Sequence, residues 1–181
     1  MENIAIEILQ TKNWIEQVVM GCNFCPFAAK VFHEQRIRYV VDNNSNPNNT
    51  IDLLMAECNY LSDNPSTATT FIIIPNNYKD FFEYLDVVIK AEKQLKKAGL
   101  EGVYQVASFH PQYCFAGSNN NDAANYTNRS PYPMLHILRE NDVTAALNFY
   151  KNPDAIPEKN IAFAQQKGLA YMQQLFNNSL Q

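Results

Sequence analysis

The side chains best suited to chemistry gather in one polar segment, Ser108–Tyr132. Arg129 offers a planar guanidinium that suits a carboxylate or a phosphate. His110 can accept or donate a proton near neutral pH. Aromatic rings accompany both groups, and aromatic walls with a few placed polar groups are typical of small-molecule pockets. We expect this segment to hold whatever small molecule the protein binds or transforms.

A thiol from another part of the chain could complete such a site. Cys25 and His110 would form a nucleophile and its base if the fold brought them within hydrogen-bond reach. Cys22-x-x-Cys25 has the spacing of redox motifs, but those motifs follow a strand and open a helix, whereas this pair follows a predicted helix. The competing interpretations are a small apolar residue for Cys25 and a hydrogen-bonded structural residue for His110.

Other classes of site have less support. His33, His110 and His136 lack the His-x-x-x-His or Glu-x-x-His spacing of metal sites, so we expect no metal. The chain has five glycines and no glycine-rich phosphate loop. Which cofactor the protein uses, if any, cannot be predicted from the sequence. A net charge of -4 and a pI of about 5.3 argue against a nucleic-acid partner.

The sequence also gives expectations about location. The longest apolar run, Phe71–Ile74, is too short to span a membrane. The first ten residues contain two glutamates and no basic stretch, which is unlike a signal peptide. We therefore expect a cytoplasmic protein whose four cysteines are reduced.

The polar segment must be positioned by helices and strands, and their predicted order is α-β-α-β-α-β-loop-β-α-α. The segment forms the loop between the third and fourth strands, and loops of this length in compact domains are functional or disordered. Asp142 is expected to cap the short helix after the fourth strand. Helices are predicted from apolar spacing over 4–20, 51–61, 78–98, 142–150 and 158–176. Strands are predicted from β-branched and aromatic runs over 36–41, 69–74, 103–109 and 134–138.

This order predicts an α/β fold in a single domain over residues 1–181. Two successive β-α-β units favour parallel strands joined by right-handed crossovers. The fourth strand is reached through a loop, so we expect it to run antiparallel. The result is one mixed sheet of about four strands with helices packed on it. An α+β ferredoxin-like sandwich is the alternative, and both folds place functional loops at the ends of strands.

Four strings of residues carry a resemblance: Asn23–Ala28, Arg36–Val41, His110–Gly117 and Asn125–His136. Together they resemble a bacterial family of small proteins that is catalogued as a domain of unknown function, number fourteen-fifteen. The resemblance spans nearly the whole chain, and the string Asn-Tyr-Thr-Asn-Arg-Ser-Pro-Tyr-Pro is highly specific. The family has no established activity, so the resemblance implies signature residues but no reaction. The family usually has an apolar residue in place of Cys22, which argues against a two-thiol mechanism.

Three hypotheses of function stay open. The first is an enzyme acting on a small anionic metabolite, with Arg129 holding the anion and with Cys25 and His110 as the catalytic residues. The second is a non-catalytic module that binds a small molecule or a partner through the same loop. The third is a structural role, in which the signature locks the loop to the sheet. The substrate-binding candidates are Tyr113, Asn125, Tyr126, Asn128, Arg129, Ser130 and Tyr132.

Overall fold

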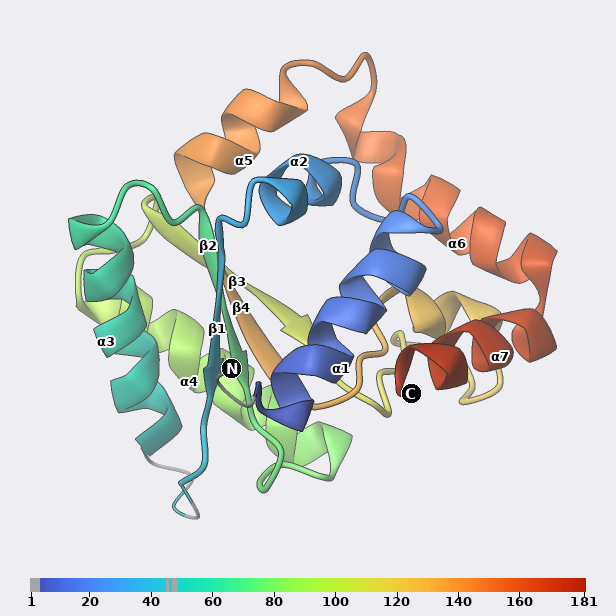
Figure 1. The fold of residues 1–181 in the computed structure, drawn as a ribbon, viewed down its shortest axis with the longest axis horizontal. Coiled ribbons are helices and arrows are strands. Elements are labelled where there is room, and N and C mark those ends of the chain that lie inside the picture. The colour runs from blue at the N-terminus through green and yellow to red at the C-terminus, as the bar shows by residue number, and fades with distance from the viewer. Residues whose placement is uncertain (1–3, 45, 47–48) are drawn as a thin grey trace.

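The computed structural model describes residues 4–44, 46 and 49–181. Its centre is a four-stranded sheet with the strand order β1-β2-β4-β3 (Figure 1). β1 and β2 pair in parallel, and β4 runs antiparallel between β2 and β3. The strands are β1 (Ile37–Val41), β2 (Thr69–Ile73), β3 (Tyr104–Phe109) and β4 (Met134–Arg139). The α/β fold with one mixed sheet is confirmed, and β4 has the expected direction.

Helices cover the first face of the sheet because alternate strand residues are apolar there. Leu135 and Ile137 of β4 and Ile72 of β2 point to this face and are fully buried. The helices that pack on them are α3 (Asn49–Asp63) and α4 (Phe81–Lys97). Tyr84 of α4 is buried between helix and sheet, and its hydroxyl donates to the carbonyl of Met134 at 2.6 Å.

The second face carries Phe71, Ile73 and Met134 and is covered by other helices. Figure 1 shows α3 and α4 on one side of the sheet, and α1, α6 and α7 on the other. Helices on both faces make three layers, unlike the two layers of the ferredoxin-like alternative. The covering elements are α1 (Ile6–Trp14), its π-helical continuation η1 (Ile15–Met20), α6 (Ile156–Lys167) and α7 (Leu169–Ser179).

Three helical features differ from the sequence expectation. Residues Ala28–His33 form a short helix, α2, in a segment for which the sequence predicts no helix. The expected C-terminal helix is two helices, α6 and α7, because Gly168 adopts φ 84° and ψ 161°, which are not helical angles. The helix α5 (Glu140–Leu147) begins after Arg139, so the prediction of Asp142 as its cap is wrong. Asp142 lies in the first turn instead, where a negative charge is favourable to the helix dipole.

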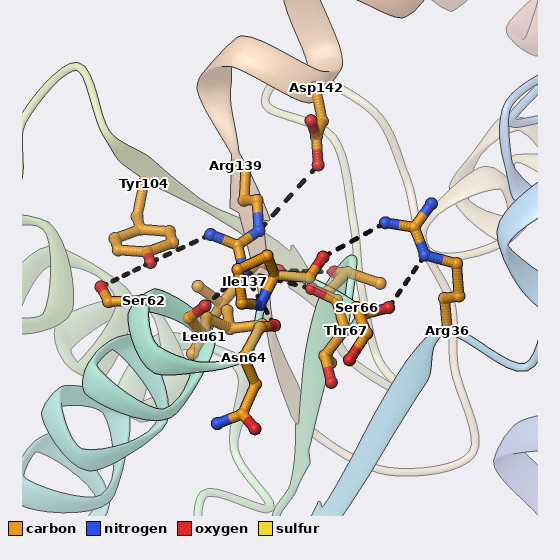
Figure 2. Close-up of polar contacts among 12 residues, drawn as sticks. Arg36, Leu61, Ser62, Asn64, Ser66, Thr67, Tyr104, Ile137, Arg139 and Asp142 are labelled. Atoms are coloured by element: carbon orange, nitrogen blue, oxygen red, sulfur yellow. Dashed lines mark hydrogen bonds and ion pairs between the residues drawn. The ribbon is translucent and has the colours of Figure 1, made fainter.

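Two arginines hold the connection between α3 and β2 (Figure 2). The guanidinium of Arg139 donates to three carbonyl oxygens of the Leu61–Thr67 segment. Arg36 donates through Nε to the carbonyl of Ser66 at 2.9 Å. The carbonyl of Leu61 lies in the last turn of α3, where it lacks a full set of helical partners, and the other carbonyls belong to the connection that follows the helix. The two arginines also fix the point at which the chain enters β2 at Thr69.

The structure also bears on membrane spanning and on the state of the cysteines. Within the described residues, no helix is long and apolar enough to cross a membrane. All four cysteines are free thiols.

Candidate functional site

The connection between β3 and β4 is held together by its own polar side chains. Asn125 is fully buried, its Oδ1 accepts from the backbone N–H of Phe115 at 3.0 Å, and its Nδ2 donates to the carbonyl of Asn119 at 2.8 Å. Asn125 belongs to the 3₁₀ helix η2 (Ala123–Thr127). A buried amide is costly without partners, so these bonds tie the two halves of the loop to each other.

Arg129 makes its contacts inside the same loop. Its Nε donates to the carbonyl of Tyr113 at 3.1 Å, and its Nη2 donates to the carbonyl of Asn120 at 2.9 Å. The guanidinium also lies 4.8 Å from the centre of the Tyr126 ring. The backbone carbonyl of Arg129 accepts from the indole N–H of Trp14 at 2.9 Å, which joins the loop to α1. Most of this cation is therefore directed at the protein.

The other binding candidates complete this network. The hydroxyl of Ser130 donates to the carbonyl of Tyr132 at 2.6 Å, and the Tyr132 hydroxyl donates to Gln10 of α1 at 2.5 Å. The side-chain oxygen of Asn128 accepts from the hydroxyl of Thr127 at 2.8 Å. The structure thus brings the predicted loop residues together, with these polar atoms bonded to protein.

His110 lies buried at the end of β3, against Phe81 and Tyr84 of α4. Its Nδ1 accepts from the backbone N–H of Gln112 at 3.0 Å, so the ring proton is on Nε2, which donates to the carbonyl of Tyr78 at 2.8 Å. Burial lowers the pKa of His110 below its ordinary value. The imidazole is neutral near pH 7, and both of its nitrogens are engaged.

Cys25 lies just before α2 and is exposed as a residue. Protein atoms around the thiol shield it from water and raise its pKa, and the backbone N–H groups of Phe27 and Ala28 oppose this effect. The preceding residue, Phe24, packs in the core of the second face, whereas His110 packs against α4 on the first face. No contact joins Cys25 to His110 within the described residues, so the structure does not bring this pair together.

A different histidine, His136 of β4, has the features of a site. It lies on the second face, and its ring stacks on Phe71 with 3.8 Å between the ring centres and 9° between the planes. Its Nε2 is 2.7 Å from the hydroxyl of Thr69, and that hydroxyl donates its single proton to the carbonyl of Ile137 at 2.5 Å. Nε2 must therefore carry the ring proton and donate it to Thr69, which leaves a lone pair on Nδ1.

The Nδ1 atom of His136 makes no hydrogen bond within the described part of the chain. The one buried side-chain polar atom there without a partner is the hydroxyl of Thr70, so Nδ1 is not sealed in the core. His136 and its neighbour Ala107 keep part of their surface exposed, whereas Leu135 on the first face has none. The second face is thus incompletely covered beside His136.

The protein atoms around the ring also set the charge of His136. Burial lowers the pKa of His136 from 6.5 to about 3, so the ring is neutral at pH 7. The sequence contains a signal for this residue: strand alternation places it on the same face as Met134 and Leu138, which are both apolar. A polar residue on an otherwise apolar strand face requires a structural or functional reason.

No group of three or more histidine, cysteine, aspartate or glutamate side chains in the described residues could hold a metal ion. The fold and the site together define an α/β protein with an oriented, neutral histidine on a partly open sheet face. Over residues 7–174, the chain matches the family model described as "Protein of unknown function (DUF1415)". The chain belongs to this family, and the resemblance found in the sequence is confirmed. No curated protein and no solved structure matches it.

Proposed function

We propose that the protein binds a small organic molecule on the open part of the second sheet face, beside His136. The observation that carries this proposal is the lone pair of Nδ1, which no hydrogen-bond donor among the described residues uses while Thr69 holds Nε2. Ligand sites are mainly apolar with a few placed polar groups. The second face supplies Phe71 and neighbouring apolar residues, and His136 supplies an acceptor for a hydroxyl or amino group of the ligand.

Binding has more support than catalysis. A general base works best when its pKa lies near the working pH, and a pKa of about 3 makes His136 a weak base. The raised pKa of Cys25 reduces the thiolate that a nucleophile needs. Arg129 donates to loop carbonyls, which leaves less of it for an anion. These features favour the non-catalytic module over the enzyme acting on an anionic metabolite.

The loop between β3 and β4 then has a supporting role. Through its carbonyl, Arg129 holds Trp14, whose ring centre is 6.5 Å from that of Phe71 and 5.1 Å from that of Phe109. Phe71 in turn carries the ring of His136. The loop thereby fixes the helix α1 that borders the proposed site.

The availability of Nδ1 can be tested with diethyl pyrocarbonate, which modifies accessible, unprotonated imidazole nitrogens. Mass spectrometry should find modification at His136 and at the exposed His33, which serves as an internal standard. His110 should stay unmodified in the folded protein, because both of its nitrogens are engaged.

A thermal-shift screen of a metabolite library then tests binding. Compounds that stabilise the protein should slow modification of His136 and leave that of His33 unchanged. They should lose their effect on His136→Phe, which keeps a ring but has no nitrogen. The proposal fails if such compounds bind while His136 stays fully reactive, or if they bind the variant equally well.

A further inference from the structure

A row of rings crosses the second face of the sheet at one level. The strand register places Tyr39 of β1, Phe71 of β2, His136 of β4 and Ala107 of β3 side by side. The first three side chains form a stack. Tyr39 and Phe71 are 6.1 Å apart between ring centres with planes at 11°, and Phe71 and His136 are 3.8 Å apart at 9°. The row of parallel rings therefore runs towards β3.

The row ends in a methyl group where the next ring would stand. Ala107 follows His136 in the row, and β3 is the edge strand of the sheet. One face of the imidazole is covered by Phe71, and the only other ring near it within the described residues is Phe109, 6.1 Å away and tilted by 41°. Both Ala107 and His136 are partly exposed, and Gln105, the next residue of β3 on this face, is exposed.

The dimensions of the sheet suit a ring at this position. Neighbouring strands lie about 4.8 Å apart. Aromatic pairs prefer ring centres roughly 4.5–7 Å apart in offset or tilted arrangements. A ring standing over Ala107 would therefore continue the row at a normal stacking distance from His136.

We infer that the ligand is a flat aromatic or heteroaromatic ring that bears a hydroxyl or amino group, and that this ring stands over Ala107 against the face of His136 opposite Phe71. The donor group is required because the free lone pair of Nδ1 accepts a hydrogen bond and lies in the plane of the imidazole. A ring that is offset and tilted against the imidazole brings a hydroxyl or amino group at its edge towards Nδ1. This inference rests on the proposed function and names the chemical class of its ligand.

Phenol and cyclohexanol test the inference because they share a hydroxyl and differ in flatness. Each is titrated into isotope-labelled protein while the ring nitrogens of His136 and the backbone amide of Ala107 are followed by NMR. Phenol should shift both sets of signals and bind roughly tenfold more tightly than cyclohexanol, which is the factor expected for one stacked ring.

The second part of the experiment fills the space above Ala107 with a larger side chain. In Ala107→Leu, phenol should bind at least about tenfold more weakly, since the leucine occupies the place of the ring. Gln105→Leu is the matched control, because it adds the same side chain to the same strand face one row away, and its phenol affinity should be unchanged. Ala107→Val replaces the first variant if circular dichroism shows that Ala107→Leu does not fold.

The results separate the inference from the proposed function. Equal affinities for phenol and cyclohexanol, no shift at His136 with phenol, or full phenol affinity in a folded Ala107 variant would overturn the flat ring. The proposed function stands in those cases if a library compound still protects His136 from modification. It fails with the inference only if no compound does.

Discussion

Acidification should destabilise the protein through His136. The folded-state pKa of about 3 lies below the ordinary value of 6.5. Between these values the unfolded chain binds a proton that the folded protein does not bind, so stability falls as the pH falls. The contribution of His136 is fully present above about pH 6.5 and is lost progressively towards pH 3.

The size of the effect follows from the same two pKa values. Each pH unit inside this window costs about 1.4 kcal/mol. Lowering the pH from 7 to 5 crosses about 1.5 units of the window, so His136 should remove about 2 kcal/mol of unfolding free energy. This is a large fraction of the stability of an ordinary domain, about 5–15 kcal/mol.

Urea unfolding at pH 7 and pH 5 measures this loss in the wild type and in His136→Gln, which does not titrate. The wild type should lose about 2 kcal/mol more than the variant over this interval. His110→Gln is the control for the other buried histidine, whose pKa is also lowered, and it should keep the contribution of His136. Equal losses in the wild type and in His136→Gln would refute the lowered pKa of this ring.

Three further predictions concern the loop and the thiol. Arg129→Ala removes two hydrogen bonds to loop carbonyls and should lower the unfolding free energy by about 2–3 kcal/mol. The melting temperature should fall by several degrees. An unchanged melting temperature would contradict the role of Arg129 in stabilising the loop. Asn125→Asp loses a donor and buries a carboxyl group, so urea unfolding at pH 7 should show a loss of at least about 2 kcal/mol, and a smaller loss would mean that the amide bonds matter little. Cys25, measured in Cys114→Ser, should react with a disulfide reagent more slowly at pH 7 than free cysteine does, because its pKa is raised; a faster reaction would point to an activated thiol.

The strands could be predicted closely from the sequence. The sequence predicts a strand over Thr69–Ile74, and the structure has β2 over Thr69–Ile73. A β-branched run that is followed by Pro75 favours a strand over any other secondary structure. The direction of β4 could also be predicted. A strand that follows β3 through a loop, without a crossover helix, most readily returns antiparallel beside it.

Two of the three helical errors have local causes. The six-residue helix α2 is too short to show apolar periodicity. At Gly168 the apolar pattern continues on both sides, so spacing alone could not place the break between α6 and α7. The break depends on a backbone conformation with positive φ, which glycine permits but does not impose.

The role of the loop could not be predicted for a different reason. From the sequence alone, the arginine, asparagines and hydroxyls of this loop suggest ligand-binding groups. In the fold, Arg129 and Asn125 bond to backbone groups that lie up to sixteen residues away in sequence. A sequence shows which groups can form hydrogen bonds, but it does not show which backbone atoms will be near them.

The difference between His110 and His136 shows what the fold adds. His110 and His136 are both neutral and both lie at or in strands, so neither residue type nor location separates them. They differ in what holds the second nitrogen: a backbone N–H occupies Nδ1 of His110, whereas Thr69 takes only Nε2 of His136. Arg36 and Arg139 fix the entry of the chain into β2, and Thr69 is the first residue of that strand. Because the Thr69 proton is committed to a backbone carbonyl, the ring proton of His136 lies on Nε2 and the lone pair lies on Nδ1. The acceptor of the proposed site is therefore oriented through the connection that leads into β2, and not through the polar loop between β3 and β4.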